Sequence, residues 1–308
     1  MSRRKGGRKD PASTRADLSV AEGFIGSEAP WKIKSILILL LLAAVAVSYG
    51  NSIYGVFVFD DHTQILNNPY IKSIKNIPAI FLSGFSHLNI TGVNYYRPIL
   101  EVSYLWDRFL YGTWVVGYHI TSILIHMLST VVLFLLIQRI FRKIKISFLT
   151  ALLFGVHPIY TSAVTYISGR GDSIVILFIL SSLLFYVKYL QFPRKKLKYL
   201  IPAVLSLFLA LLTKETALFF VVVLFLYRYC HSQDPGHPID ASRWRAVYIS
   251  AITAVVIYLF MRSAAIANIV TLQYNVAASS DWHVRFFTSI RAFLNYLILL
   301  AFPVGLHL

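Results

Sequence analysis

Residues 114–138 read WVVGYHITSILIHMLSTVVLFLLIQ, a stretch that contains no Asp, Glu, Lys or Arg. A run of about 20 mostly apolar residues is long enough to cross the hydrocarbon core of a bilayer as a helix. Similar runs occupy 33–52, 145–157, 172–191, 198–213, 215–230, 245–262 and 285–303. We therefore predict an all-α integral membrane protein, a multi-pass bundle of seven or eight helices. Two runs, 145–157 and 198–213, are short, so each tilts or continues into the next polar turn.

The composition excludes an ordinary water-soluble protein, because 57% of the residues are hydrophobic and only 14% are charged. The net charge of +16 would suggest nucleic acid in a soluble chain. Here Lys and Arg gather in the segments 3–34, 139–145, 194–198 and 228–245, at alternate ends of the apolar runs. Basic residues of this kind mark the cytoplasmic side of a membrane protein. We expect membrane lipids as partners and no nucleic acid.

Two parts follow from this topology: a basic cytoplasmic tail over 1–31 and a polytopic membrane domain over 32–308. We call the opposite, non-cytoplasmic side the far side. On it we place 53–113, 158–171, the turn near 214 and 263–284. The long first loop holds two amphipathic stretches, 70–88 and 98–111, that suit helices lying at the membrane surface.

The second of these stretches opens with Pro98, which favours a first helical turn. Ile99, Val102, Trp106 and Phe109 fall on one of its faces, and Glu101 and Arg108 fall on the other. A simpler interpretation is that both stretches merely pack at the membrane surface.

An acid pair, Asp60-Asp61, follows the first apolar run and precedes His62. Adjacent carboxylates repel each other, and partial burial raises the proton affinity of one of them, which suits a general base or a metal ligand. A divalent metal is not required, but Asp60, Asp61 and His62 are its candidate ligands if one binds. The alternative is that the pair only caps or solvates the end of the first helix.

Further polar groups lie in the far-side segments. Arg97, Arg170 and Lys214 supply cations, His157 supplies a hydrogen-bond donor, and Asp172 and Glu215 are acids beside two of the cations. Ion pairs within so apolar a chain are costly unless they line a cavity or face water. Arg170 and Asp172 could simply pair with each other. In the functional interpretation the cations hold a phosphate and His157 donates to a diphosphate or a sugar hydroxyl.

Six short motifs follow one another along the chain. They are Phe59-Asp60-Asp61, Ile65-Leu66-Asn67-Asn68, Tyr95-Tyr96-Arg97-Pro98, Gly155-Val156-His157-Pro158, Gly169-Arg170-Gly171-Asp172 and Lys214-Glu215. This ordered set, spanning about residues 33–305, resembles the membrane half of the transmembrane and tetratricopeptide-repeat protein O-mannosyltransferases, which are GT-C glycosyltransferases.

The resemblance implies a GT-C-like membrane domain that moves a sugar, typically mannose, from a polyprenyl-phosphate carrier to a hydroxyl of a protein or glycan acceptor on the far side. By the family's pattern Asp60 or Asp61 is the base, and we expect an inverting transfer. We assign Arg97, Arg170 and Lys214 to the leaving phosphate, with Asp172 and Glu215 orienting the cations. Family members carry further helices and repeats of about 34 residues. This chain shows no such repeat, so we expect a C-terminally truncated version.

Two other function classes fit a chain of this composition. A transporter or lipid-handling protein would use intramembrane charges to line a path, and an inactive fragment would act as a scaffold. Charges clustered at far-side helix ends favour the enzyme over the transporter. The basic tail and short loops favour a bacterial inner membrane, with the endoplasmic reticulum as the alternative.

Overall fold

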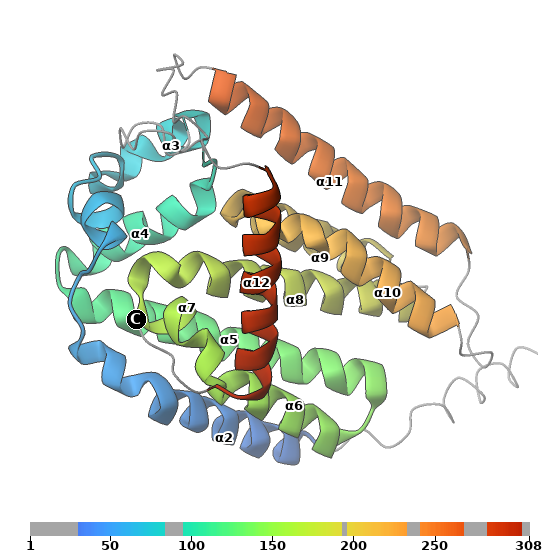
Figure 1. Ribbon diagram of the computed structural model, residues 1–308. Helices are drawn as coiled ribbons and strands as arrows, with labels where there is room; N and C mark the ends of the chain where they lie inside the picture. Colours follow the sequence, from blue (N-terminus) through green and yellow to red (C-terminus); the bar gives the residue numbers. More distant parts are fainter. Residues whose placement is uncertain (1–29, 84–94, 193–195, 233–240, 268–281, 304–308) are drawn as a thin grey trace, which may run out of the picture.

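The computed structural model describes residues 30–83, 95–192, 196–232, 241–267 and 282–303, which form helices and turns without a strand among them. All eight predicted apolar runs are helical, which confirms the predicted fold class (Figure 1). The helices are α2 (Trp31–Tyr49), α3 (Ile77–Ser83), α4 (Pro98–Tyr111), α5 (Val115–Phe141), α6 (Ile144–Val156), α7 (Thr161–Thr165), α8 (Arg170–Gln191), α9 (Lys196–Thr213), α10 (Phe220–Ser232), α11 (Ala241–Ala267) and α12 (Trp282–Ala301). Most of the basic tail lies outside the described residues.

Among the residues that the structure describes, five helical segments are long and apolar enough to cross a membrane, and a sixth arises if α6 and the turn after it form one span bent by 46°. This bent pair, Ile144–Val156 and Pro158–Thr165, is the short run that we expected to tilt or to continue into the next turn. The helices α9 and α10 fall below the length of a full span, because the polar dipeptide Lys214-Glu215 separates them.

The bundle is centred on α8, which packs between α5 and α9 (Figure 1). Its buried residues Leu184 and Val187 belong to the largest apolar cluster, which also includes Leu136 of α5, Leu211 of α9 and Val247 of α11. Since α8 carries this central packing, the turn that begins it is held firmly against its neighbours.

The segment between α2 and α5 has a core of its own. Ile65, Ile71 and Ile80 pack with Leu100 and Tyr104 in a second buried cluster. The predicted helix at 98–111 is present, with Pro98 in its first turn. Its two faces separate as the sequence indicates: Trp106 and Phe109 are 48% and 63% exposed, whereas Glu101 is fully buried. The face that turns toward the protein therefore combines apolar side chains such as Leu100 with buried acids such as Glu101.

The stretch 70–88 departs from a single helix. Two short turns, Tyr70–Lys72 and Ile74–Asn76, precede α3, and 84–88 lie outside the described residues. The helical turns are interrupted at Ser73. Its backbone is extended, and its hydroxyl accepts a hydrogen bond from the Lys75 amide at 3.3 Å. Ser at such a position competes with helix by capping the next turn.

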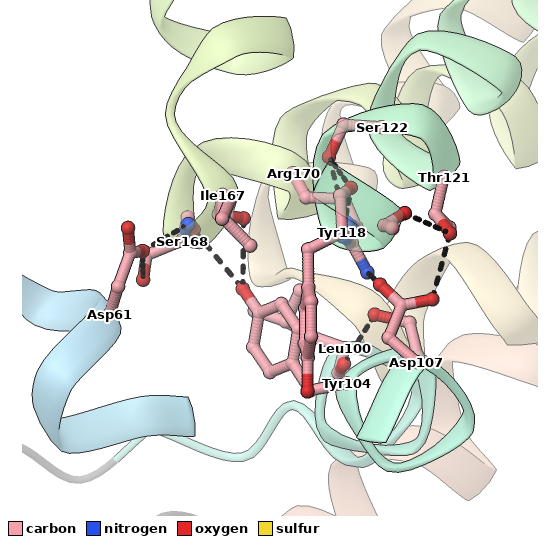
Figure 2. Close-up of polar contacts among 12 residues, drawn as sticks. Asp61, Leu100, Tyr104, Asp107, Tyr118, Thr121, Ser122, Ile167, Ser168 and Arg170 are labelled. Carbon is pink, nitrogen blue, oxygen red and sulfur yellow. Dashed lines mark hydrogen bonds and ion pairs between the residues drawn. The ribbon is translucent and has the colours of Figure 1, made fainter. Parts of the chain in front are cut away.

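An ion pair lies within the protein where α4, α5 and α8 meet (Figure 2). Arg170 begins α8 and is completely buried, with its Nη1 2.6 Å from Oδ2 of Asp107 on α4. The guanidinium also donates to the Ser122 hydroxyl at 3.0 Å and to the Tyr118 carbonyl at 2.7 Å, and Thr121 donates to Asp107 at 2.8 Å. A buried charge needs this kind of pairing. The pair joins the surface helix α4 to two membrane helices.

We predict that Arg170→Met destabilises the protein by about 3–5 kcal/mol, because it leaves the Asp107 carboxylate buried without its cation. The double variant Arg170→Met/Asp107→Leu should recover most of this loss, since neither charge of the pair is left without its partner. Reversible unfolding in mixed micelles measures both values. Equal losses in the single and double variants would contradict the pairing.

Labelling from the two sides of sealed membranes tests the predicted topology. With Cys230, which is exposed, first replaced by Ser, a cysteine at His62 should react with an impermeant thiol reagent from the far side only. A cysteine at Lys145 should react from the opposite side only. Reaction of both from one side would show that the assignment of loops is wrong.

Candidate active site

The two adjacent acids have different surroundings in the structure. Asp61 is fully buried. Its Oδ1 accepts hydrogen bonds from the Ser168 amide at 2.8 Å and from the Ser168 hydroxyl at 2.5 Å, and its Oδ2 accepts one from the Val58 amide at 3.0 Å. Asp60 is exposed, and from the described part of the chain its carboxylate accepts one long contact, of 3.5 Å, from Gln64. Asp61 therefore anchors the loop, and Asp60 is the acid that a substrate can reach.

The backbone at Phe59 explains why neighbouring acids point to different places. Phe59 has a φ of 48°, in the left-handed region that a bulky residue rarely adopts. Two contacts hold the turn against Tyr166: the aromatic rings of Phe59 and Tyr166 meet edge to face at 6.5 Å, and the Asp60 amide donates to the Tyr166 hydroxyl at 3.1 Å. Strain of this kind persists only where surrounding contacts enforce it, and it is frequent at functional sites.

The segment 168–172 connects the acid pair with the other polar motifs. Ser168 binds Asp61, Arg170 turns inward to Asp107, and Asp172 turns to Lys214 (Figure 2 shows the first two). Tyr104 supports the same turn, because its hydroxyl lies 3.3 Å and 3.4 Å from the carbonyl oxygens of Ile167 and Ser168. Gly169 is required here, since a Cβ would lie 2.2 Å from the Ser162 carbonyl oxygen.

Two ion pairs remain partly exposed beside this segment. Lys214 Nζ lies 2.5 Å from Asp172 Oδ1, and the side chains are 24% and 46% exposed. Arg97 forms a two-pronged contact with Glu215 at 2.9 Å and 3.1 Å, and its guanidinium lies 3.9 Å from the centre of the Tyr95 ring. Adjacent residues 214 and 215 thus bind partners from two distant parts of the chain, and both pairs offer a cation at the protein surface.

Glu215 is ionised in this arrangement. Burial alone raises the pKa of its carboxyl, but the hydrogen bond from Arg97 and the charges of Arg97 and Arg262 outweigh burial and leave the pKa lowered. The pair with Arg97 is therefore present at neutral pH and is lost only as the pH falls through this lowered pKa.

Arg170 differs from the role that the sequence suggested. Its guanidinium is buried against Asp107, so Arg170 does not pair with Asp172 and is not placed to contact a phosphate. We therefore leave it out of the set of residues that could touch a phosphate. Asp107 was missed by sequence reasoning, although an acid among the buried positions of an amphipathic helix is a signal for a hidden cation.

His157 and His62 lie apart from the ion pairs. The Nδ1 of His157 accepts from the Ile159 amide at 3.2 Å, so Nε2 carries the proton and donates to the Leu300 carbonyl of α12 at 3.0 Å. His62 is exposed. No group of three or more His, Cys, Asp or Glu side chains able to hold a metal occurs within the described ranges. A metal at Asp60, Asp61 and His62 stays a prediction, and it would compete with the amide and hydroxyl donors already bound to Asp61.

Comparison with known proteins identifies relatives of this chain. Residues 110–261 match the model of the family described as dolichyl-phosphate-mannose-protein mannosyltransferase, a range that includes Arg170, Lys214 and Glu215 but not Asp60 or Asp61. No solved structure matches the chain.

Several animal proteins are similar in sequence. Protein O-mannosyl-transferase F38B6.6 of Caenorhabditis elegans is 32% identical over 60% of this chain and 26% of its own length. Protein O-mannosyl-transferases TMTC1 and TMTC3 of Mus musculus are 34% and 31% identical over 63% and 62% of this chain, and over 22% and 21% of their own lengths. The chain thus matches about a quarter or less of each relative. The chain is similar to the protein O-mannosyl-transferases over about 60% of its length, and this similarity is consistent with the membrane half of that family.

Proposed function

We propose that this chain is the membrane part of a mannosyltransferase that transfers mannose from a lipid-linked phosphate donor to a hydroxyl on the far side of the membrane. The family's description names a dolichyl-phosphate-mannose donor, and the relatives are named protein O-mannosyl-transferases. A protein hydroxyl is therefore the acceptor that we favour. The single observation that carries the mechanism is the division of the acid pair into a buried Asp61 and an exposed Asp60.

Asp60 is the proposed general base. A base must be within reach of the proton it removes, and it must not already be saturated with hydrogen bonds. Asp61 has used both oxygens on Ser168 and Val58, whereas Asp60 retains an accessible carboxylate. The turn at Phe59 and the Tyr166 contact hold its backbone in place, so less of the residue has to be ordered when the acceptor binds.

Lys214 and Arg97 are the proposed contacts of the donor phosphate. Each is a partly exposed cation that is already oriented by a carboxylate, Asp172 and Glu215 respectively. A phosphate between them would gain two cationic contacts where negative charge develops. The carboxylates would keep the cations in place before the donor arrives and after the phosphate leaves.

The proposed step balances as a single displacement. The acceptor oxygen forms a bond to the anomeric carbon while its proton passes to the Asp60 carboxylate. The bond between the anomeric carbon and the phosphate oxygen breaks, and its electron pair stays with the lipid phosphate beside Lys214 and Arg97. Attack from the side opposite the leaving group inverts the anomeric centre.

The membrane in which this takes place is proposed from the relatives. All three relatives named above are animal proteins. They favour the endoplasmic reticulum over the bacterial inner membrane that the basic tail and short loops suggested. The far side would then be the lumen of that organelle.

The acid pair yields a direct prediction. Asp60→Asn should lower mannosyl transfer from polyprenyl-phosphate mannose to a Ser/Thr-containing peptide pool by about 10²–10⁴, the range of general-base catalysis, while the melting temperature stays unchanged. Asp61→Asn should instead lower the melting temperature, because three hydrogen bonds lose their charged acceptor. Radiolabel transfer and thermal unfolding of the same preparations measure both effects. A fully active Asp60→Asn protein would overturn the assignment.

The cation contacts yield a second prediction. Lys214→Gln should raise the KM for the lipid-linked donor about tenfold, since hydrogen bonds to charged groups contribute about 1.5–3 kcal/mol. The matched control is Lys75→Gln, which removes an exposed lysine charge from the first loop, a different segment from the one that carries Lys214. If both variants change the KM equally, general surface charge and not the Lys214 contact binds the donor.

A further inference from the structure

Negative charge among the described residues lies at only one end of the helices. The acidic residues within the described ranges are Asp60, Asp61, Glu101, Asp107, Asp172 and Glu215, and all of them belong to the far-side end. The opposite end, where α5 and α8 finish and α11 begins, carries cations but none of these carboxylates. This end lies away from the proposed donor site and needs a separate explanation.

The cations converge on the last turn of α8. Arg243 of α11 donates through Nη1 to the Leu190 carbonyl and lies over the Tyr189 ring, 5.5 Å from its centre. Arg139 of α5 lies over the Phe192 ring at 4.5 Å, and Lys188 lies 5.4 Å from the centre of the Phe185 ring. The helices α5, α8 and α11 therefore place positive charge close together, next to aromatic rings.

Part of this arrangement is ordinary helix chemistry. The C-terminus of a helix carries a partial negative charge, so cations near the ends of α5 and α8 are stabilised there. The aromatic faces add a further attraction. These two effects explain why Arg243 contacts Leu190 and Tyr189.

They do not explain the remaining features. Arg139 and Lys198 lie close enough to Lys188 for their charges to act on its ammonium group, and like charges repel. In addition, Nη2 of Arg243 is buried and has no hydrogen-bond partner among the residues that the structure describes. A buried donor without a partner is costly. A negatively charged group with several acceptor oxygens would offset the repulsion among these cations and would accept a hydrogen bond from Nη2 of Arg243.

We propose that the ends of α5, α8 and α11 form a binding site for the phosphate of an anionic lipid headgroup, held by Lys188 and Arg243 beside Arg139. The segment Ile167–Gln191 is long and apolar enough to span the membrane, so its last turn falls at the level of the headgroups. Anionic lipids are concentrated in the cytoplasmic leaflet, the side to which the basic segments assign this end. The phosphate supplies acceptors that match the guanidinium fork of Arg243.

Native mass spectrometry of the full chain tests the site. The protein is released from phosphatidylcholine nanodiscs, and phosphatidylinositol, further phosphatidylcholine or inorganic phosphate is added in separate titrations. Phosphatidylinositol should bind the native protein, and Lys188→Gln and Arg243→Gln should each weaken it about tenfold, the loss expected for one charged hydrogen bond. Arg243→Lys, which keeps the charge, should bind more tightly than Arg243→Gln.

The matched control is Lys145→Gln, an exposed lysine in the first turn of α6 on the same side of the membrane. It should bind phosphatidylinositol like the native protein. Equal losses in all three Gln variants would replace the site by general surface attraction. Equally tight binding of inorganic phosphate would overturn the lipid as ligand, and equally tight binding of phosphatidylcholine would overturn the requirement for an anionic headgroup. None of these outcomes depends on mannosyl transfer.

Discussion

The pair between Arg170 and Asp107 fixes the geometry on which the candidate active site depends. Arg170 is the first residue of the central helix α8, and its charge is buried where α4 and α5 close over it. A charge in this position is stable only while Asp107 and the α5 oxygen atoms remain in place. Because Arg170 points inward, Ser168 and Asp172 on either side of it meet Asp61 and Lys214. One interior contact thereby sets the positions of Ser168 and Asp172, the residues that bind Asp61 and Lys214.

The same arrangement gives neighbouring residues different tasks. Asp61 holds the turn and leaves Asp60 accessible, and Lys214 and Glu215 bind Asp172 and Arg97 from separate segments. Charged residues near a bilayer are retained only if they are wet or paired. Each of the three groups that we place in the chemistry, Asp60, Arg97 and Lys214, is exposed or partly exposed, and each of the two cations is paired with the carboxylate that positions it.

The sequence predicted the helices, but it did not predict the ion pair between Arg170 and Asp107. Apolar runs have a length that the bilayer dictates, so the class of fold follows from composition and spacing. The motif residues Arg97, Asp172, Lys214 and Glu215 also meet in the structure. The partner of Arg170 was not predictable, because residue type does not reveal whether a side chain at a helix start turns inward or outward. The stretch 70–88 was misjudged for a local reason, the capping turn at Ser73.

Equilibrium binding of the lipid-linked mannose donor separates the base from the phosphate contacts most directly. If Asp60 acts only on the acceptor proton, Asp60→Asn should bind the donor with a Kd within about twofold of the native value while its mannosyl transfer is strongly reduced. Lys214→Gln, by contrast, should bind it about tenfold more weakly. A loss of donor binding in Asp60→Asn as large as that in Lys214→Gln would contradict the division of roles between these residues.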